Sequence, residues 1–304
     1  MECSDVQLLS GIYRKNTADA QLVFYGHYYY YWNGTINMRK SAAVIPVLAL
    51  IAGAFGFIIR QMEVNTAFES ATGFAKRNAS TTAILIALSG LVIILAVLFA
   101  LLAMTKFKAD NDYAKAFAPK GFIYIVAVFV LALGWIAADI LYFFEKRTVM
   151  TVIDIVWIFL AAVTAFALVF LARGAYKGRG GTELLLFSLI PPIFFCYWLI
   201  ILYKDNAANP VLLSYCYQCL ALAAAALSFY FSAGFVYNKS ATARSLVSFL
   251  VTIYFCAVVL ADNILLPLKI IFGITLIFQF INTVVFIRNL KRIKIPPCHS
   301  EQEV

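Results

Sequence analysis

Long apolar blocks, separated by short polar connectors, follow one another from residue 41 to residue 287. A helix that crosses the hydrocarbon core of a bilayer needs about 20 apolar residues, and each block approaches or exceeds that length. The chain is 63% hydrophobic and only 13% charged, far from the composition of soluble domains. We therefore predict an all-α, polytopic transmembrane helical bundle with about eight spans: Ser41–Ile59, Thr81–Met104, Gly121–Phe144, Val149–Ala172, Leu184–Tyr203, Val211–Tyr237, Leu246–Ala261 and Ile264–Ile287.

Two boundaries of this scheme are open. Only Asp262 and Asn263 separate the last two blocks. The first block contains Ala52-Gly53-Ala54, which resembles a signal-peptide cleavage site, and cleavage there would leave seven spans. Apolar residues continue beyond that tripeptide to Ile59, which favours an uncleaved helix.

The distribution of Lys and Arg predicts the orientation, because connectors rich in these residues stay on the cytoplasmic side. With eight spans and a cytoplasmic N-terminus, the inner segments hold 17 of the 24 basic residues and the outer segments hold six, Arg60 among them. Both termini are then cytoplasmic. The net charge of +9 lies in connectors rather than on a basic face, so the predicted partner is a lipid bilayer and no nucleic acid.

The first 37 residues are polar and lack an apolar period. Met38-Arg39-Lys40 follows directly and resembles the start of a membrane protein. Two interpretations are open: residues 1–37 are an untranslated extension upstream of the true start, or they are a disordered cytoplasmic tail. The predicted bundle then covers residues 38–290, and residues 291–304 form a cytoplasmic tail.

Two aspartates fall inside predicted spans, where a charged side chain is costly and is a candidate for function. Asp139 and Asp154 are equally far from the connector at Lys146 and Arg147, so we expect equal depth and a shared site for a proton or cation. The alternative is that each faces a water-filled crevice or pairs with a nearby lysine or arginine. Helical spacing places an aromatic ring beside each aspartate, and these rings line either a pocket for a cation or an interfacial belt: Trp135 and Trp157.

Pro191-Pro192 predicts a break in the fifth span, a feature that marks substrate sites in several transporters and also occurs without such a role. Tyr215 and Gln218 open the sixth span at the predicted outer side. Together with the aspartates they suggest a polar site that faces outward.

Motifs of enzymes are missing from the spans. The sequence contains no glycine-rich phosphate loop and no nucleophile elbow, and its only histidines, His27 and His299, lie outside the apolar blocks. We therefore predict no catalytic residues, no cofactor and no metal.

Two stretches of the sequence resemble a group of known proteins, and this resemblance implies a type of source organism. The stretch Arg60-x-x-Glu63-x-x-Thr66-Ala67-Phe68-Glu69-x-x-Thr72-Gly73, and the region from Asn209-Pro210-Val211-Leu212 to Ala233-Gly234-Phe235, are similar to uncharacterised multi-pass membrane proteins of anaerobic Gram-positive bacteria. The resemblance implies a location in the bacterial cytoplasmic membrane. It implies no activity and transfers no functional residue.

Three functional hypotheses follow. The first is a transporter-like or ligand-binding membrane protein that takes a small solute or cation at its outward-facing polar site. The second is a non-catalytic scaffold or sensor that acts through protein partners. The third is an intramembrane enzyme, which the missing motifs disfavour. The sequence does not indicate the oligomeric state.

Overall fold

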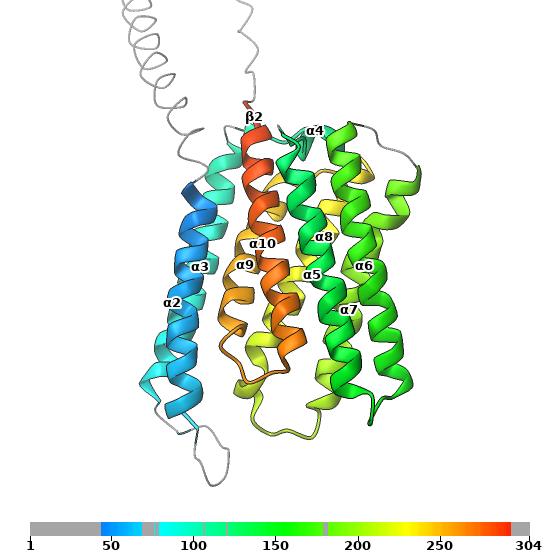
Figure 1. Cartoon of the computed structure of the whole chain (residues 1–304). Coiled ribbons are helices and arrows are strands. Elements are labelled where there is room, and N and C mark those ends of the chain that lie inside the picture. Colours follow the sequence, from blue (N-terminus) through cyan, green and yellow to red (C-terminus); the bar gives the residue numbers. More distant parts are fainter. Residues whose placement is uncertain are drawn as a thin grey trace, which may run out of the picture. The chain divides into compact units, whose positions relative to one another are not determined.

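The computed structural model describes residues 44–68, 76, 79–105, 107–119, 121–178 and 182–292. The predictions for residues 1–37, for a start at Met38 and for residues 293–304 lie outside this range. The chain divides between Ile45 and Pro46, and the account below concerns the unit from Pro46 onward. Among the described residues, eight helices are long and apolar enough to cross a membrane, which confirms the predicted polytopic bundle (Figure 1): α2 (Val44–Thr66), α3 (Ser80–Met104), α5 (Ile123–Lys146), α6 (Val152–Lys177), α7 (Thr182–Asp205), α8 (Cys216–Val236), α9 (Thr242–Val259) and α10 (Leu266–Asn289).

Short elements lie in the connectors. The one-turn helix α4 (Tyr113–Ala116) follows strand β1 (Phe107–Lys108), and the 3-10 helix η1 (Leu212–Ser214) precedes α8. Strand β2 (Lys291–Arg292) pairs antiparallel with β1. The predicted C-terminal tail therefore begins with two residues that belong to the folded unit.

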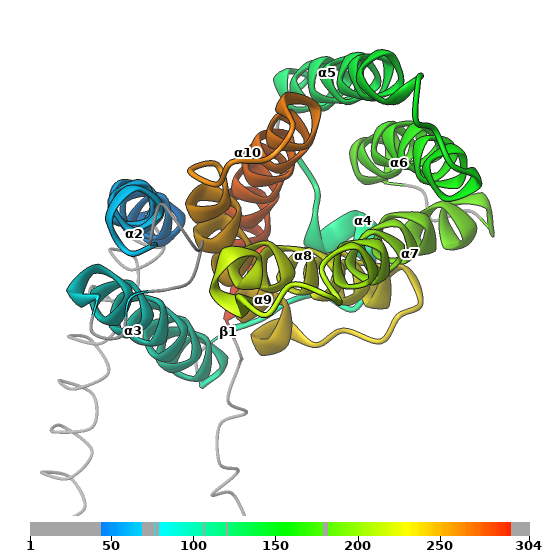
Figure 2. The same ribbon diagram turned by 90° about the horizontal axis from the view of Figure 1, so that it is seen from below.

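Six helices form a closed ring. Each of α5 to α9 packs against the next helix along the chain, and α10 packs against both α9 and α5 (Figure 2). Helix α3 packs on α9 from outside the ring. Helix α2 also approaches α9, where Gly53 and Gly56 lie against Ala257, Val258 and Tyr254. The small glycines allow this close approach, as is common between membrane helices.

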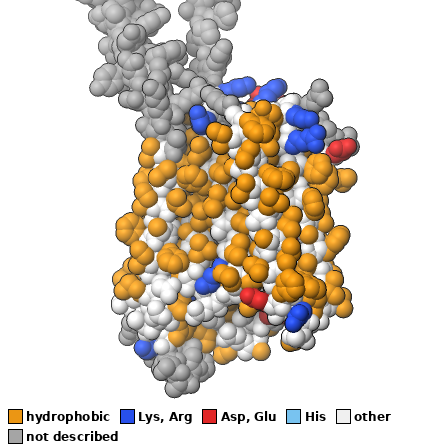
Figure 3. All heavy atoms as spheres, in the orientation of Figure 1, with side chains coloured by type: hydrophobic (Ala, Val, Ile, Leu, Met, Phe, Trp, Pro, Cys, Tyr) orange, Lys and Arg blue, Asp and Glu red, His pale blue; other side chains and the backbone are white. Residues whose placement is uncertain are grey.

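The six-helix ring is apolar on its inner and its outer surface, but the two surfaces carry different kinds of apolar residue. Alanines and aromatic residues fill the interior, among them Trp135, Phe194 and Phe195, each with 0% of its surface exposed. Aliphatic side chains cover the outside, and basic side chains gather at the ends (Figure 3). Such an outer surface suits contact with lipid chains rather than with water.

Helix α4 closes one end of the ring. Phe117, the residue after α4, is buried and contacts the rings of Phe235, Phe249 and Phe286 from α8, α9 and α10. Asn289 Nδ2 also donates hydrogen bonds to the carbonyl oxygens of Ala116 and Ala118. We call this end the α4 end. The other end holds the connectors 147–151, 206–215 and 260–265, and we call it the Asp262 end.

Two differences from the sequence-based prediction affect polar or helix-breaking residues. The first span continues past Ile59 to Thr66 and therefore includes Arg60 and Glu63. The predicted break at Pro191-Pro192 is wrong, because both prolines lie inside one uninterrupted helix, α7. Proline removes backbone donors, yet membrane helices tolerate it where neighbouring helices hold the segment. Here α6 and α8 flank α7, and the aromatic residues after the prolines are buried.

The contact between α2 and α9 predicts a clear difference between two glycines. A Cβ atom at Gly53 would lie 2.7 Å from Ala257 Cβ, which cannot rotate away, whereas a Cβ at Gly90 on α3 would meet nothing within 4 Å. We expect Gly53→Ala to destabilise the protein by about 1–3 kcal/mol through overpacking. Gly90→Ala is expected to be neutral or stabilising by up to about 1 kcal/mol, through helix propensity. Thermal unfolding of the purified protein in detergent tests this, and equal Tm values for the two variants would contradict the packing.

Candidate functional site

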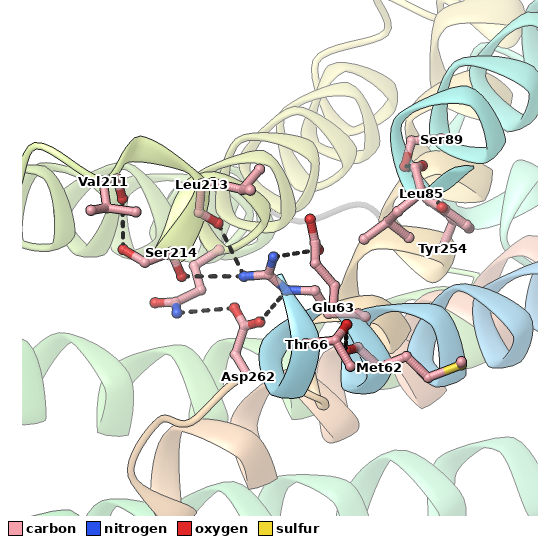
Figure 4. Close-up of polar contacts among 12 residues, drawn as sticks. Met62, Glu63, Thr66, Leu85, Ser89, Val211, Leu213, Ser214, Tyr254 and Asp262 are labelled. Carbon is pink, nitrogen blue, oxygen red and sulfur yellow. Dashed lines mark hydrogen bonds and ion pairs between the residues drawn. The ribbon is translucent and has the colours of Figure 1, made fainter. Parts of the chain in front are cut away.

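A cluster of buried charges lies at the Asp262 end. Arg60 Nε donates a hydrogen bond to Asp262 Oδ1 at 2.6 Å, and Arg60 Nη1 donates to Glu63 Oε2 at 2.7 Å (Figure 4). Gln218 Nε2 donates to the second oxygen of Asp262 at 3.0 Å. All three charged side chains are at most 2% exposed. We call Arg60, Glu63, Asp262 and Gln218 the Arg60 cluster.

The Arg60 cluster joins distant parts of the chain. Arg60 Nη2 lies within hydrogen-bond distance of the carbonyl oxygens of Leu213 and Ser214, at 3.2 and 3.3 Å. Its guanidinium carbon lies 4.9 Å from the centre of the Tyr217 ring, close enough for a cation–π contact. Through one side chain, α2 is therefore attached to the start of α8 and to the connector between α9 and α10.

The charges of the cluster do not balance, because two carboxyl groups face one guanidinium. Both oxygens of Asp262 accept hydrogen bonds, whereas Glu63 Oε1 is buried and has no partner. Burial raises the pKa of Asp262 above its ordinary value, and Arg60 and Gln218 offset part of that rise because they favour the ionised carboxylate. The Arg60 cluster therefore serves mainly to connect helices. Glu63 is the member of the cluster that has a carboxyl oxygen without a hydrogen-bond partner.

A second polar site lies inside the six-helix ring. Asp139 on α5 is 4% exposed, and neither of its carboxyl oxygens has a hydrogen-bond partner. Trp135, one turn earlier on the same buried face, also has no partner for its indole N–H. Buried polar groups are normally hydrogen-bonded, so two such groups on one helix face are unusual.

Aromatic rings surround this face of α5. Trp135 contacts Phe194 and Phe195 of α7, with ring centres 5.8 and 6.2 Å apart. Tyr142, one turn after Asp139, lies 4.4 Å from Trp157 of α6, measured between ring centres. Further ring contacts connect these residues into one group, which we call the aromatic cluster: Trp135, Tyr142, Trp157, Phe194, Phe195, Trp198 and Phe272.

Asp154 has a different role from Asp139. It forms a capping box at the start of α6, where its Oδ2 accepts hydrogen bonds from the backbone N–H and hydroxyl of Thr151. Its Oδ1 accepts a hydrogen bond from the Tyr142 hydroxyl at 2.9 Å, and Lys146 Nζ lies 4.0 Å away. Asp154 is thus occupied by contacts that fix the start of a helix.

The predicted equal depth of the two aspartates is wrong. Asp139 lies seven residues before the end of α5, and Asp154 lies two residues after the start of α6. At about 1.5 Å per residue, Asp139 is about 7.5 Å further from the end of its helix than Asp154 is from the start of its own. Among the hydrogen bonds and ion pairs of the described residues, none joins the two carboxyl groups. The capping pattern Thr151-x-x-Asp154 was visible in the sequence and would have located the start of α6.

The six residues predicted to form one polar site divide between two places. Asp139, Trp135, Trp157 and Asp154 share the neighbourhood of the aromatic cluster, although Asp154 serves the helix cap. Gln218 belongs to the Arg60 cluster, and Tyr215 is a buried residue just before α8. Arg60 and Glu63 are not among the predicted site residues, because Arg60 was assigned to an outer connector. Their spacing of three residues, typical of a helical ion pair, was the available signal.

The fold and these sites define a class: the chain is a polytopic α-helical membrane protein with buried polar groups in its interior. No known protein family, no curated protein and no solved structure matches it. The resemblance to multi-pass proteins of anaerobic Gram-positive bacteria stays a prediction. Within the described residues, no group of three or more His, Cys, Asp and Glu side chains could hold a metal ion.

The Arg60 cluster predicts a large effect on stability. Arg60→Leu leaves two buried carboxyl groups without their cation, and breaking a buried ion pair in this way costs about 3–5 kcal/mol. Arg60→Lys keeps the charge but not the planar fork, so we expect an intermediate loss. Lys204 is an exposed residue on α7, so Lys204→Leu is the control and should leave Tm nearly unchanged. Thermal unfolding in detergent measures all three, and a wild-type Tm for Arg60→Leu would exclude the proposed connection.

Proposed function

We propose that this protein is a transporter-like, ligand-binding membrane protein that takes a small cation inside the six-helix ring, beside Asp139. The observation that carries the proposal is the buried Asp139 carboxyl group, which has no hydrogen-bond partner and no ion pair among the described residues. An unpaired buried charge is costly in a protein and more so at membrane depth, so it is retained where a ligand or proton completes it.

The surroundings of Asp139 support a cation rather than an anion. A carboxylate attracts positive charge, and the faces of aromatic rings add to that attraction. Lys146, at the end of α5, lies 4.0 Å from a carboxyl oxygen of Asp154, and no ion pair of the described residues includes Asp139. The scaffold or sensor hypothesis and the enzyme hypothesis gain no comparable support from the described residues.

The closed α4 end indicates a direction of access. Phe117 and its three aromatic partners fill the α4 end of the ring, whereas Asp139 lies nearer the Asp262 end. In the proposed function a ligand therefore reaches Asp139 from the Asp262 end. Tyr142 and Trp157 lie between Asp139 and that end, so these two rings have to separate before a ligand can pass.

The orientation in the membrane is part of the proposal. Basic residues are concentrated in the elements and connectors of the α4 end, including Lys108, Lys115, Lys239, Arg244 and Lys291. By the positive-inside rule we place the α4 end and both termini in the cytoplasm of a bacterial cell, and the Asp262 end outside. The reassignment of Arg60 from a connector to the protein interior strengthens the asymmetry, because one outer charge no longer contributes to it.

This orientation predicts that a C-terminal epitope tag is protected in intact cells. Protease added to whole cells should leave the tag uncut, and the same protease should remove it after the membrane is opened. A tag inserted in the connector between α7 and α8, at the Asp262 end, is the matched control and should be cut in intact cells. Cleavage of the C-terminal tag in intact cells would reverse the assignment.

The ligand site predicts a cation-dependent gain in stability that requires Asp139. A panel of small inorganic and organic cations, neutral solutes and anions is added to the purified protein, and Tm is measured. We expect at least one cation to raise Tm of the wild type and to have no effect on Asp139→Asn, which removes the charge but keeps the shape. A ligand that binds only the folded state at 100 times its Kd adds about 2.7 kcal/mol.

Two further variants separate binding from folding. Asp205→Asn changes an exposed carboxyl group at the end of α7 and should keep the cation response. Asp154→Ala removes the acidic member of the capping box, whose N-cap residue is Thr151, and should lower Tm through the loss of about 0.5–2 kcal/mol, while the response to the cation remains. If Asp139→Asn leaves every response intact, the proposed site is refuted and the scaffold hypothesis becomes the better one.

A further inference from the structure

The unpartnered polar atoms inside the ring describe the ligand that would complete them. Six buried side-chain atoms of the described residues lack a hydrogen-bond partner, and three of the six belong to Asp139 and Trp135. Asp139 offers two acceptor oxygens, and Trp135 offers one N–H donor, which can only donate. The concentration of these atoms on one turn of α5 distinguishes this site from isolated packing defects elsewhere.

From this pattern we infer that the ligand is a protonated amine with its own N–H donors and with a hydrogen-bond acceptor a few bonds away. The inference rests on the proposed function and names the ligand class of the same site. The ammonium N–H groups would donate to the two oxygens of Asp139. The nearby acceptor, such as a hydroxyl or carbonyl oxygen, would receive the Trp135 N–H.

Hydrogen bonding favours a protonated amine over a quaternary ammonium ion. A quaternary ion can sit against aromatic rings, but it has no N–H group and leaves both oxygens of Asp139 without a donor. Hydrogen bonds between charged groups are the stronger ones, and leaving their partners unmade in a buried site is costly. Aromatic rings alone would suit either ion, so Asp139 is the group that discriminates.

The spacing of Trp135 and Asp139 on α5 limits how far the ligand's acceptor can lie from its ammonium group. Trp135 and Asp139 are four residues apart, so their Cβ atoms are about 5–6 Å apart on one helix face. A short ligand can therefore reach both side chains at once. The ring contacts from Trp135 to Phe194 and Phe195 place the indole on the side of α5 that faces α7.

Three matched ligands test the inference: ethanolamine, propylamine and choline. Ethanolamine has the ammonium donors and a hydroxyl acceptor, propylamine lacks the acceptor, and choline is ethanolamine with its N–H groups replaced by methyl groups. We expect the full-length protein in detergent to bind ethanolamine about tenfold more tightly than propylamine, the effect of one good hydrogen bond. We expect a larger loss, above about tenfold, for choline, because it leaves both oxygens of Asp139 without a donor. Calorimetry or thermal shift at millimolar ligand measures these affinities.

Variants assign the two contacts separately. Asp139→Asn should abolish the binding of ethanolamine and propylamine. Trp135→Phe keeps a ring but removes the N–H, so it should weaken ethanolamine about tenfold and leave propylamine unchanged. The Tm of each variant without ligand, compared with the wild type, shows whether it is folded; should Trp135→Phe not fold, the comparison of ethanolamine with propylamine on the wild type tests the same contact.

The outcomes separate the two levels of the proposal. If choline binds as tightly as ethanolamine and Asp139→Asn abolishes both, the site takes cations but the amine inference is wrong. If ethanolamine and propylamine bind equally, the role of Trp135 is wrong. If no cation of any kind shows an effect that depends on Asp139, the proposed function itself fails, and the inference fails with it.

Discussion

Charged groups buried in a helical membrane protein have to find their partners within the protein, and this constraint organises the structure. Arg60 illustrates it. Its guanidinium binds two carboxyl groups, lies near two backbone carbonyls and packs on one aromatic ring, and these partners come from α2, η1, the start of α8 and the connector between α9 and α10. Because lipid offers no hydrogen bonds, such a side chain fixes which helices lie together more strictly than apolar packing alone.

The same constraint makes Asp139 informative. The Arg60 cluster shows that this chain can satisfy a buried carboxyl group, as it does for Asp262 with one cation and one amide. Asp154 is satisfied as well, by a helix cap and a tyrosine hydroxyl. Asp139 differs from both of these aspartates, because its carboxyl group has no partner. The difference supports a site completed by something other than the protein.

Much of the fold was predictable because the bilayer sets a simple requirement on length and composition. The number of spans followed from the apolar blocks, and the part of the chain that the structure describes contains eight such helices. The polar residues of the interior were harder to predict, because hydropathy alone assigns charged residues to the connectors. Arg60 was misplaced for this reason, although the ion-pair spacing to Glu63 was present. Neither hydropathy nor residue spacing could pair Arg60 with Asp262, because 202 residues separate them and only the packed bundle brings them together.

Local signals also competed with tertiary packing. Pro191 and Pro192 suggested a break, but the flanking helices and the buried aromatic residues that follow keep α7 continuous. The error at Asp154 was the opposite one. A symmetric hairpin was assumed there, but the local capping pattern determines where α6 starts.

The two polar sites and the plug at α4 together give the ring an asymmetric interior. Three aromatic contacts and an amide seal the α4 end around Phe117, while both buried acidic sites lie towards the Asp262 end. The Arg60 cluster has a structural use because it connects helices, whereas an unpartnered carboxyl group such as Asp139 adds nothing to the packing of a purely structural bundle. An interior sealed at one end, with an unsatisfied acid behind two aromatic rings at the other, fits a protein that admits a ligand from one side.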